Sequence, residues 1–175
     1  MMNIRRATVE DAREIVVIKQ KIVETTNFFL RSPEEPQEKA EDYQKKIQTG
    51  QENGGLTLVV EFNDQVIGFL SFSRSSYIRL HHAGSFGMGI KPEFGNAGIG
   101  TKLLSHFIEW AKEQEGLEKI CLDVFSNNER AINLYKRLGF REEGRQINQI
   151  RFKDGSYADI ILMALYIKIP SKFAY

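Results

Sequence analysis

Apolar positions in the first 50 residues recur at the spacing of an α-helix. From Thr8 onward they fall three or four residues apart and predict an amphipathic helix, with Ile15, Ile18, Ile22 and Val23 on its apolar face. Thr8 and the acidic residues after it are typical of a helix start. Residues 32–36 contain two prolines and break the helix. The charged run 39–48 predicts a second, solvent-facing helix that ends near Gly50.

The pattern then changes to β-rich runs bounded by turn residues. Residues 56–62 and 65–72 flank Asn63-Asp64 and predict a hairpin with a short turn. Residues 83–90 predict a third strand, which is unusually rich in glycine. A short, mixed segment at residues 3–8 predicts a strand before the first helix.

The rest of the chain alternates between strands and helices. The predicted elements are the helix 99–115, the strand 119–125, the helix 128–138 and a final hairpin of residues 140–152 and 157–169. Both helices carry their apolar residues on one face, and a glycine follows each of them.

Together these elements predict an α/β fold with a mixed, mostly antiparallel sheet of about seven strands. The segment 83–125 runs strand, helix, strand and should form a right-handed parallel crossover. Hairpins supply antiparallel pairs, and we expect helices on both faces of the sheet. A chain of 175 residues is most simply one domain, 1–175, because domains hold roughly 100–200 residues.

Composition argues against several classes of protein. The net charge is +1, whereas a nucleic-acid binder usually carries a strongly basic face. The longest apolar run, 160–167, is far shorter than the roughly 18–20 residues of a membrane helix. Residues 1–6 lack the apolar core of a signal peptide, and the single cysteine, Cys121, suits a reducing compartment. We therefore expect a cytoplasmic protein with neither a nucleic-acid partner, a membrane partner nor a metal.

The candidate chemistry lies in a glycine-rich stretch. Residues 91–101 join a predicted strand to the start of the helix 99–115. The unpartnered amides and the dipole of a helix start favour anions, and glycine lets a ligand approach the backbone, so this stretch predicts a phosphate cradle. A Walker loop would need Gly-Lys-Ser/Thr, but Thr101 follows Gly100 here, and the order of a dinucleotide-binding Gly-x-Gly-x-x-Gly is reversed. A glycine-rich connection without a ligand stays open as the alternative.

A second motif follows thirty residues later, where residues 128–140 read Asn-Glu-Arg-Ala-Ile-Asn-Leu-Tyr-Lys-Arg-Leu-Gly-Phe. This motif and Gly98-x-Gly100 resemble the GNAT superfamily of acyl-CoA-dependent N-acetyltransferases. Members of that family carry (Arg/Gln)-x-x-Gly-x-(Gly/Ala) at a helix start and a later Asn-x-x-Ala-Ile-x-Leu-Tyr-x-x-x-Gly-Phe. The order of elements fits from residue 3 to 167, and the tail 169–175 lies outside the resemblance.

One position departs from the family pattern. Gly95 stands where the family has Arg or Gln. The side-chain contact that the family makes to the pyrophosphate is therefore missing, while backbone contacts from Gly98 onward are retained. Lys91 and Lys102 are neighbouring cations that could compensate, although solvated helix-surface lysines are the simpler interpretation of both.

The resemblance implies that acetyl-CoA is the acetyl donor. The strand 83–90 would pair with the pantetheine amides, the loop would hold the pyrophosphate, and Asn128 would contact the cofactor arm. Tyr135 would be catalytic, giving a proton to the leaving thiolate. The implied donor-binding residues are Met88, Gly89, Ile90, Gly95, Asn96, Ala97, Gly98, Ile99, Gly100, Thr101, Asn128 and Tyr135. A helix N-cap is the other interpretation of Asn128, and a core tyrosine that of Tyr135.

A general base is also needed, because an alkyl amine with a pKa near 10 must lose a proton before it attacks. Asp123 is the catalytic candidate. It lies on the opposite face of its strand from its apolar neighbours, toward the cleft where two parallel strands part. Glu24, His81 and His82 are the alternatives.

The resemblance predicts direct transfer of an acetyl group to a primary amine within a ternary complex. The family's acceptor site corresponds here to residues 25–48 and 145–157, with residues 28–30 as an apolar wall or as a cap on the core. A small amino acid or analogue, or a protein N-terminus, is favoured as the acceptor, because no acidic cluster is evident for a polyamine. A polyamine or aminoglycoside-type acetyltransferase and a non-catalytic acyl-CoA-binding module stay open. The apolar strand 160–167 is a candidate homodimer surface.

Overall fold

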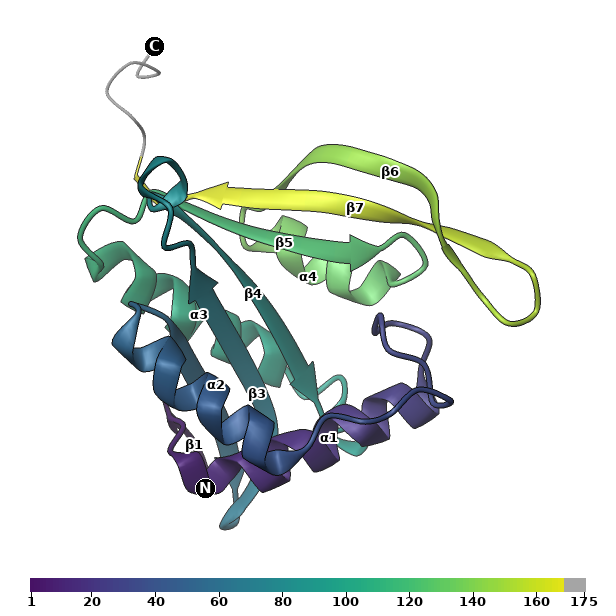
Figure 1. Cartoon of the computed structure of the whole chain (residues 1–175), viewed down its shortest axis with the longest axis horizontal. Coiled ribbons are helices and arrows are strands. Elements are labelled where there is room, and N and C mark those ends of the chain that lie inside the picture. The colour runs from purple at the N-terminus through teal and green to yellow at the C-terminus, as the bar shows by residue number, and fades with distance from the viewer. Residues whose placement is uncertain (169–175) are drawn as a thin grey trace.

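A single seven-stranded sheet forms the centre of the computed structural model, which describes residues 1–168 (Figure 1). The strand order is β1-β2-β3-β4-β5-β7-β6, and every neighbouring pair is antiparallel except the parallel pair β4 and β5. This confirms the mixed, mostly antiparallel sheet. The strands are β1 (Met2–Arg6), β2 (Leu56–Phe62), β3 (Gln65–Arg74), β4 (Ala83–Ile90), β5 (Lys119–Phe125), β6 (Arg141–Arg151) and β7 (Tyr157–Tyr166).

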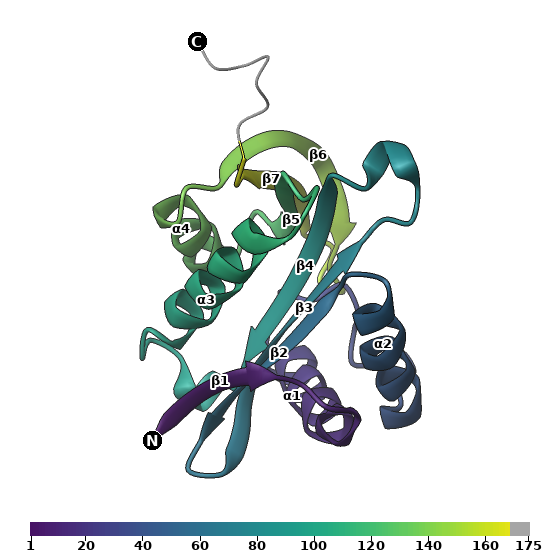
Figure 2. The ribbon, with the colours of Figure 1, turned by 90° about the vertical axis from the view of Figure 1, so that its left-hand side faces the viewer.

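Helices cover both faces of the sheet, as predicted. Figure 2 shows α1 and α2 on one face and α3 and α4 on the other. The helices are α1 (Ala12–Thr25), α2 (Ala40–Glu52), α3 (Ile99–Glu113) and α4 (Glu129–Arg137), with 3-10 turns at Val9–Asp11, Ile78–Leu80 and Pro92–Phe94.

The side chains of β2 divide between the two faces, because successive residues of a strand point to opposite sides. Leu58 and Val60 pack in the larger hydrophobic core with Phe107 of α3. Val59 packs in the smaller core with Ile18 of α1. A strand buried on both faces needs apolar residues in succession, which explains why β2 reads as a continuous apolar run.

The predicted boundaries differ from the observed ones by a few residues. The second helix runs through Gly50 to Glu52, because the Gly50 carbonyl accepts hydrogen bonds from the amides of Asn53 and Gly55. The chain leaves the helix at Gly54, whose φ is +76°. The helix 99–115 ends at Glu113, and the strand 65–72 continues to Arg74. Of the final strand 157–169, residue 169 lies outside the described residues.

The feature of the fold that positions the site is the divergence of β4 and β5. They pair only over Ala83–Ser85 and Lys119–Cys121. From Phe86 onward β4 runs away from β5, which stays paired with β7 over its whole length (Figure 1). The β5-facing edge of β4 is therefore left without a strand partner between Phe86 and Ile90.

Candidate active site

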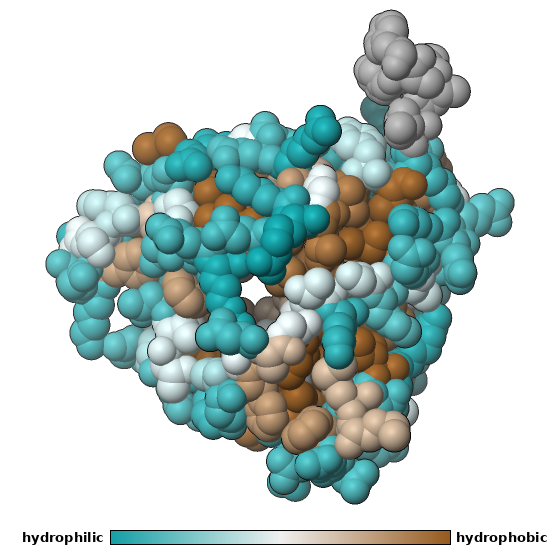
Figure 3. Space-filling model, turned by 180° about the vertical axis from the view of Figure 1, so that it is seen from behind, coloured by the Kyte–Doolittle hydropathy of each residue, from teal (hydrophilic) through white to brown (hydrophobic). Residues whose placement is uncertain are grey.

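Two neighbouring cavities lie against this open part of β4. We call them the loop cavity, of about 580 Å³, and the inner cavity, of about 510 Å³. The loop cavity is lined by β4, the glycine-rich loop 91–101, α4, the end of α1 and the start of the loop 26–39. The inner cavity is enclosed by α1, the loop 26–39, α2 and the ends of β4 and β5. Seen from behind, the surface is hollowed near its middle (Figure 3).

The glycine-rich loop presents its backbone to the loop cavity. Gly98 is the N-cap of α3 and has a φ of +72°, a conformation that side chains disfavour. This conformation turns the chain into the helix, whose first amides lack partners within the helix and carry positive potential. Of the predicted loop residues, five line the cavity: Gly95, Asn96, Gly98, Gly100 and Thr101. Ala97 and Ile99 do not, and the Ile99 side chain is buried in the core.

The predicted strand residues Met88, Gly89 and Ile90 line the same cavity. They lie on the part of β4 whose β5-facing edge has no strand partner. Such an edge offers N–H and C=O groups to an extended ligand, as it would to another strand. The strand is thus suited to pair with a chain of amides.

The space next to Gly95 is filled by Arg130. A Cβ built on Gly95 would lie 2.8 Å from Arg130 Nη1 and 3.4 Å from Nη2. Arg130 lies in the first turn of α4 and lines the loop cavity. Lys91 also lines this cavity, whereas Lys102 does not. The guanidinium of Arg130, on α4, therefore lies where a side chain at position 95 would begin.

Of the predicted donor-binding residues, three line both cavities: Met88, Asn128 and Tyr135. Phe28 and Phe29 of the predicted apolar wall also line both. Asn128 is also the N-cap of α4, since its Oδ1 accepts a hydrogen bond of 3.3 Å from the Ala131 amide. The structure therefore supports the N-cap interpretation and places the side chain beside both cavities. The two cavities meet at these residues.

Tyr135 packs among aromatic rings, with its ring centroid 6.0 Å from that of Phe86 and 5.8 Å from that of Phe140. Burial raises the pKa of Tyr135 to about 12. The hydroxyl is therefore protonated at neutral pH and can donate a proton, although the raised pKa makes it a weaker acid than a free tyrosine. Tyr135 is a core residue that also lines both cavities, and its catalytic role stays a prediction.

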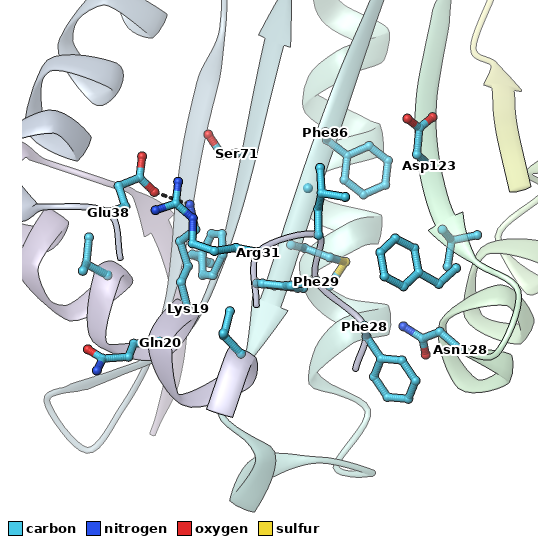
Figure 4. A pocket seen from close by; sticks show the side chains of 18 of the residues that line it. Lys19, Gln20, Phe28, Phe29, Arg31, Glu38, Ser71, Phe86, Asp123 and Asn128 are labelled. Atoms are coloured by element: carbon cyan, nitrogen blue, oxygen red, sulfur yellow. Dashed lines mark hydrogen bonds and ion pairs between the residues drawn. The ribbon is translucent and has the colours of Figure 1, made fainter. Parts of the chain in front are cut away.

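Asp123 lines the inner cavity, as predicted. Its side chain is exposed between the buried Leu122 and Val124 of β5. Figure 4 shows the carboxylate and Asn128 on the same side of the inner cavity. The alternative bases Glu24, His81 and His82 line neither cavity.

A group of charged side chains lies at the opposite end of the inner cavity (Figure 4). Glu38 binds Lys19 through Oε2 and Lys46 through Oε1. Although burial opposes it, these hydrogen bonds lower the pKa of Glu38. Arg31 lines the cavity on the same side. None of these four residues was predicted individually, although all fall within the helix pair and the loop between them.

The predicted acceptor segments are only partly correct. Residues 28–30 line the inner cavity as an apolar wall, but residues 145–157 line neither cavity. The closing hairpin instead supports the loop from outside, because Lys153 Nζ contacts Glu34 Oε1 at 2.8 Å. Of the two strands of this hairpin, β7 contributes to the lining of the inner cavity, through Ile160.

Other candidate chemistries have no support among the described residues. Within residues 1–168, no group of three or more His, Cys, Asp or Glu side chains is arranged to hold a metal ion. In the same part of the chain, no helix has the length and apolar character needed to cross a bilayer. Cys121 is half-buried, and burial raises the pKa of its thiol, so it is a poor nucleophile.

The sequence is similar to a known protein family and to several known enzymes. Residues 21–140 match the model of the acetyltransferase (GNAT) family. An L-amino acid N-acetyltransferase of Escherichia coli is 30% identical over 107 residues, which are 61% of this chain and 65% of the relative. A spermidine N(1)-acetyltransferase of Vibrio cholerae is 29% identical over 147 residues, 81% of this chain and 82% of the relative. The ribosomal protein bS18-alanine N-acetyltransferase of Escherichia coli is 36% identical over 90 residues, 51% of this chain and 60% of the relative.

Solved structures extend the similarity to nearly the whole chain. A GNAT-family acetyltransferase from Streptococcus pneumoniae has a TM-score of 0.88 and 25% identity, covering 95% of this chain and 99% of that one. The yncA protein of Salmonella typhimurium, solved with its cofactor acetyl-CoA, has a TM-score of 0.86 and 25% identity, covering 97% and 96%. The chain belongs to the acetyltransferase (GNAT) family, whose acetyl donor is acetyl-CoA.

Proposed function

We propose that this chain transfers the acetyl group of acetyl-CoA to a primary amine by direct attack in a ternary complex. The observation that carries the proposal is the junction of the two cavities at Met88, Asn128 and Tyr135. One cavity has the features of a phosphate and amide site, and the other is lined by side chains suited to an acceptor. A donor and an acceptor bound in them would meet at that junction.

The loop cavity fits acetyl-CoA. The open edge of β4 would pair with the pantetheine amides. The loop from Gly95 to Thr101 and the start of α3 would hold the pyrophosphate through backbone amides. Asn128 would contact the pantetheine arm near the junction. Because the backbone supplies most of these contacts, the site needs no large excess of lysine and arginine.

Two side chains would handle the protons of the reaction. Acetyl-CoA supplies the acetyl group as a thioester, and transfer to an amine forms an amide and breaks the C–S bond. An acceptor that starts as an ammonium loses two protons on the way, one before it attacks and one from its adduct with the acetyl carbon. Asp123, at one end of the inner cavity, would accept the first proton, directly or through water. Tyr135, protonated at neutral pH, would give a proton to the sulfur, and the second proton of the nitrogen would restore its hydroxyl.

The inner cavity favours an amino acid, its analogue or a protein N-terminus as the acceptor. A polyamine carries several ammonium groups and needs unpaired carboxylates. Glu38 is neutralised by two lysines, so Asp123 is the one carboxylate lining this cavity without an ion pair among the described residues. Two similar proteins are named for amino-acid and ribosomal-protein N-terminal acetylation, although a third is named for spermidine.

A screen with acetyl-CoA and primary amines tests the proposal, with release of free thiol as the readout. The panel holds amino acids, peptides with free N-termini, spermidine and an aminoglycoside. We expect amino acids or peptides to raise thiol release well above hydrolysis. Binding of acetyl-CoA without acceleration by any amine would leave a non-catalytic acyl-CoA-binding module as the function.

Two further expectations go with this function. A cytoplasmic location is one, and a homodimer is the other. β7 lies between β5 and β6, so its strand edges are already paired and a dimer at residues 160–167 would have to form through side chains. Light scattering on the purified protein measures the oligomeric state directly.

A further inference from the structure

The charges of the inner cavity are separated into two ends. Asp123 lies at the end where the cavities meet, near Asn128 (Figure 4). Lys19, Arg31 and Glu38 lie together at the other end (Figure 4). The other walls of the cavity are largely apolar and include Phe28, Phe29, Leu30, Phe69 and Phe86. An acceptor would therefore meet a negative charge at one end of the cavity and a group of mixed charges at the other.

The far end carries an excess of positive charge. Glu38 offsets only one of the two lysines that it binds, Lys19 and Lys46. Arg31 adds a further positive charge, and no carboxylate among residues 1–168 lies within ion-pair distance of it. Its Nη1 donates to the carbonyl of Pro36, which leaves the other guanidinium N–H groups for a ligand.

The matching ligand carries both kinds of charge. A guanidinium binds a carboxylate with two parallel hydrogen bonds, and an ammonium is attracted to Asp123. We propose that the acceptor is an amino carboxylate, an amino acid or short peptide with a free carboxylate, whose acid group binds Arg31 while its amine faces Asp123. This inference rests on the proposed function and names the substrate class of the same site.

Matched acceptors test this inference without altering the protein. Each amino acid of the panel is compared with its amide and with the amine left by removing the carboxyl group. Dipeptides and their amides show how far the carboxylate lies from the amine. We expect the best acceptor to lose about 10- to 100-fold in kcat/KM when its carboxylate is removed or masked.

The outcomes separate this inference from the proposed function. If amides and simple amines react as well as the acids, the carboxylate site is excluded while the acetyltransferase function stands. If no amine reacts at all, the function itself fails.

Variants at Arg31 give a second measurement. Arg31→Gln should lower kcat/KM for the carboxylate acceptor about tenfold and leave the value for its amide nearly unchanged. Arg13→Gln is the matched control, because Arg13 is exposed on α1 and lines neither cavity. Equal losses with acid and amide would make Arg31 a structural residue of the loop and overturn its assignment.

A different observation carries an inference about the donor. The guanidinium of Arg130 lies where a side chain on Gly95 would begin, beside the loop that starts α3. Arg130 has no carboxylate within ion-pair distance among residues 1–168. We infer that Arg130 supplies to the pyrophosphate the side-chain contact that Gly95 cannot make. The change at position 95 is thus balanced by an arginine from α4.

Calorimetric titration with CoA and 3′-dephospho-CoA tests the role of Arg130. Arg130→Gln should weaken both ligands about tenfold, because both contain the pyrophosphate. Lys136 lies on the same helix but lines neither cavity, so Lys136→Gln should change the affinity for neither ligand. Unchanged affinity in Arg130→Gln would exclude the contact, and a loss confined to CoA would assign Arg130 to the 3′-phosphate instead.

A rescue variant sharpens this test. Gly95 has φ −60° and ψ 153°, an extended conformation open to any residue. Gly95→Arg in the Arg130→Gln background should recover part of the lost affinity for both ligands. A further loss of affinity in the double variant would contradict the inference that Arg130 takes the place of a side chain at position 95.

Discussion

The loop cavity and the inner cavity are built from different parts of the polypeptide. The loop cavity presents backbone from the open edge of β4 and from a turn that Gly98 permits, together with side chains such as Arg130. The inner cavity presents side chains from segments far apart in sequence, such as Lys19, Arg31 and Asp123. Few local sequences can adopt the backbone geometry of the loop, whereas the side chains that line a cavity can be substituted one at a time. The difference explains how related chains can share a donor and differ in their acceptors.

Tyr135 lines both cavities and its replacement should have the largest effect. Tyr135→Phe removes the proton donor while keeping the ring packed against Phe86 and Phe140. We expect kcat to fall about 100-fold with little change in the affinity for acetyl-CoA. Steady-state kinetics and calorimetric titration measure the two quantities. Equal losses in both would make the hydroxyl part of the donor site and weaken the separation of the two cavities.

Replacement of Asp123 tests the inner cavity, the proposed acceptor site, alone. Asp123→Asn should lower kcat/KM for the amine about tenfold or more at pH 7, while acetyl-CoA still binds. The deficit should shrink as the pH rises toward 10, where about half of the free alkyl amine is neutral. Glu24→Gln is the control, because Glu24 lines neither cavity. A deficit that is independent of pH would assign Asp123 a role in binding and not in proton transfer.

The difference between the two cavities also determines which of their residues could be predicted from the sequence. The elements of the sheet were predicted because their signals are local, such as Asn63 and Asp64, which both adopt positive φ in the hairpin turn. Gly98 and Gly100 were predicted at the loop cavity for the same reason, since a helix start and its glycines are adjacent in the chain. Local signals and the family resemblance of two motifs thus predicted residues that line the loop cavity.

The acceptor side depends on residues that only the fold brings together. Glu38 binds Lys19 across 19 positions of sequence, and nothing in the spacing of that pair marks it. Arg130 lies inside a recognised motif, but its approach to Gly95 depends on how α4 packs beside the loop. Residues 145–157 were assigned to the acceptor site by family resemblance, and in this chain they line neither cavity.

Gly98 tests the backbone side of the comparison. Gly98→Ala places a side chain at a φ of +72°, which costs about 1 kcal/mol and shifts the loop. We expect acetyl-CoA to bind about fivefold more weakly, with little change in KM for the amine. Gly155→Ala is the matched control, because Gly155 also has a positive φ, +86°, but lies in the distant hairpin turn. Loss of donor affinity in both variants would point to general destabilisation.

Glu38 gives the smallest effect and shows how the inner cavity depends on ion pairs. Its pKa is lowered from 4.5, so the stabilisation it provides is fully present above that pH and is lost as the pH falls through the lowered value. Glu38→Gln should therefore reduce the free energy of unfolding by about 1 kcal/mol at pH 7, and the difference from the unmodified protein should narrow below pH 4.5.

Denaturant unfolding between pH 7 and pH 4 measures this difference, with Glu41→Gln, at an exposed position in the first turn of α2, as the control. The variant also removes the negative charge that offsets the two lysines, so the far end of the inner cavity becomes more positive. A carboxylate acceptor should then bind more tightly, while acetyl-CoA affinity, set by the loop cavity, should not change. A variant that altered donor affinity as much as acceptor affinity would show that the two cavities are coupled and not built independently.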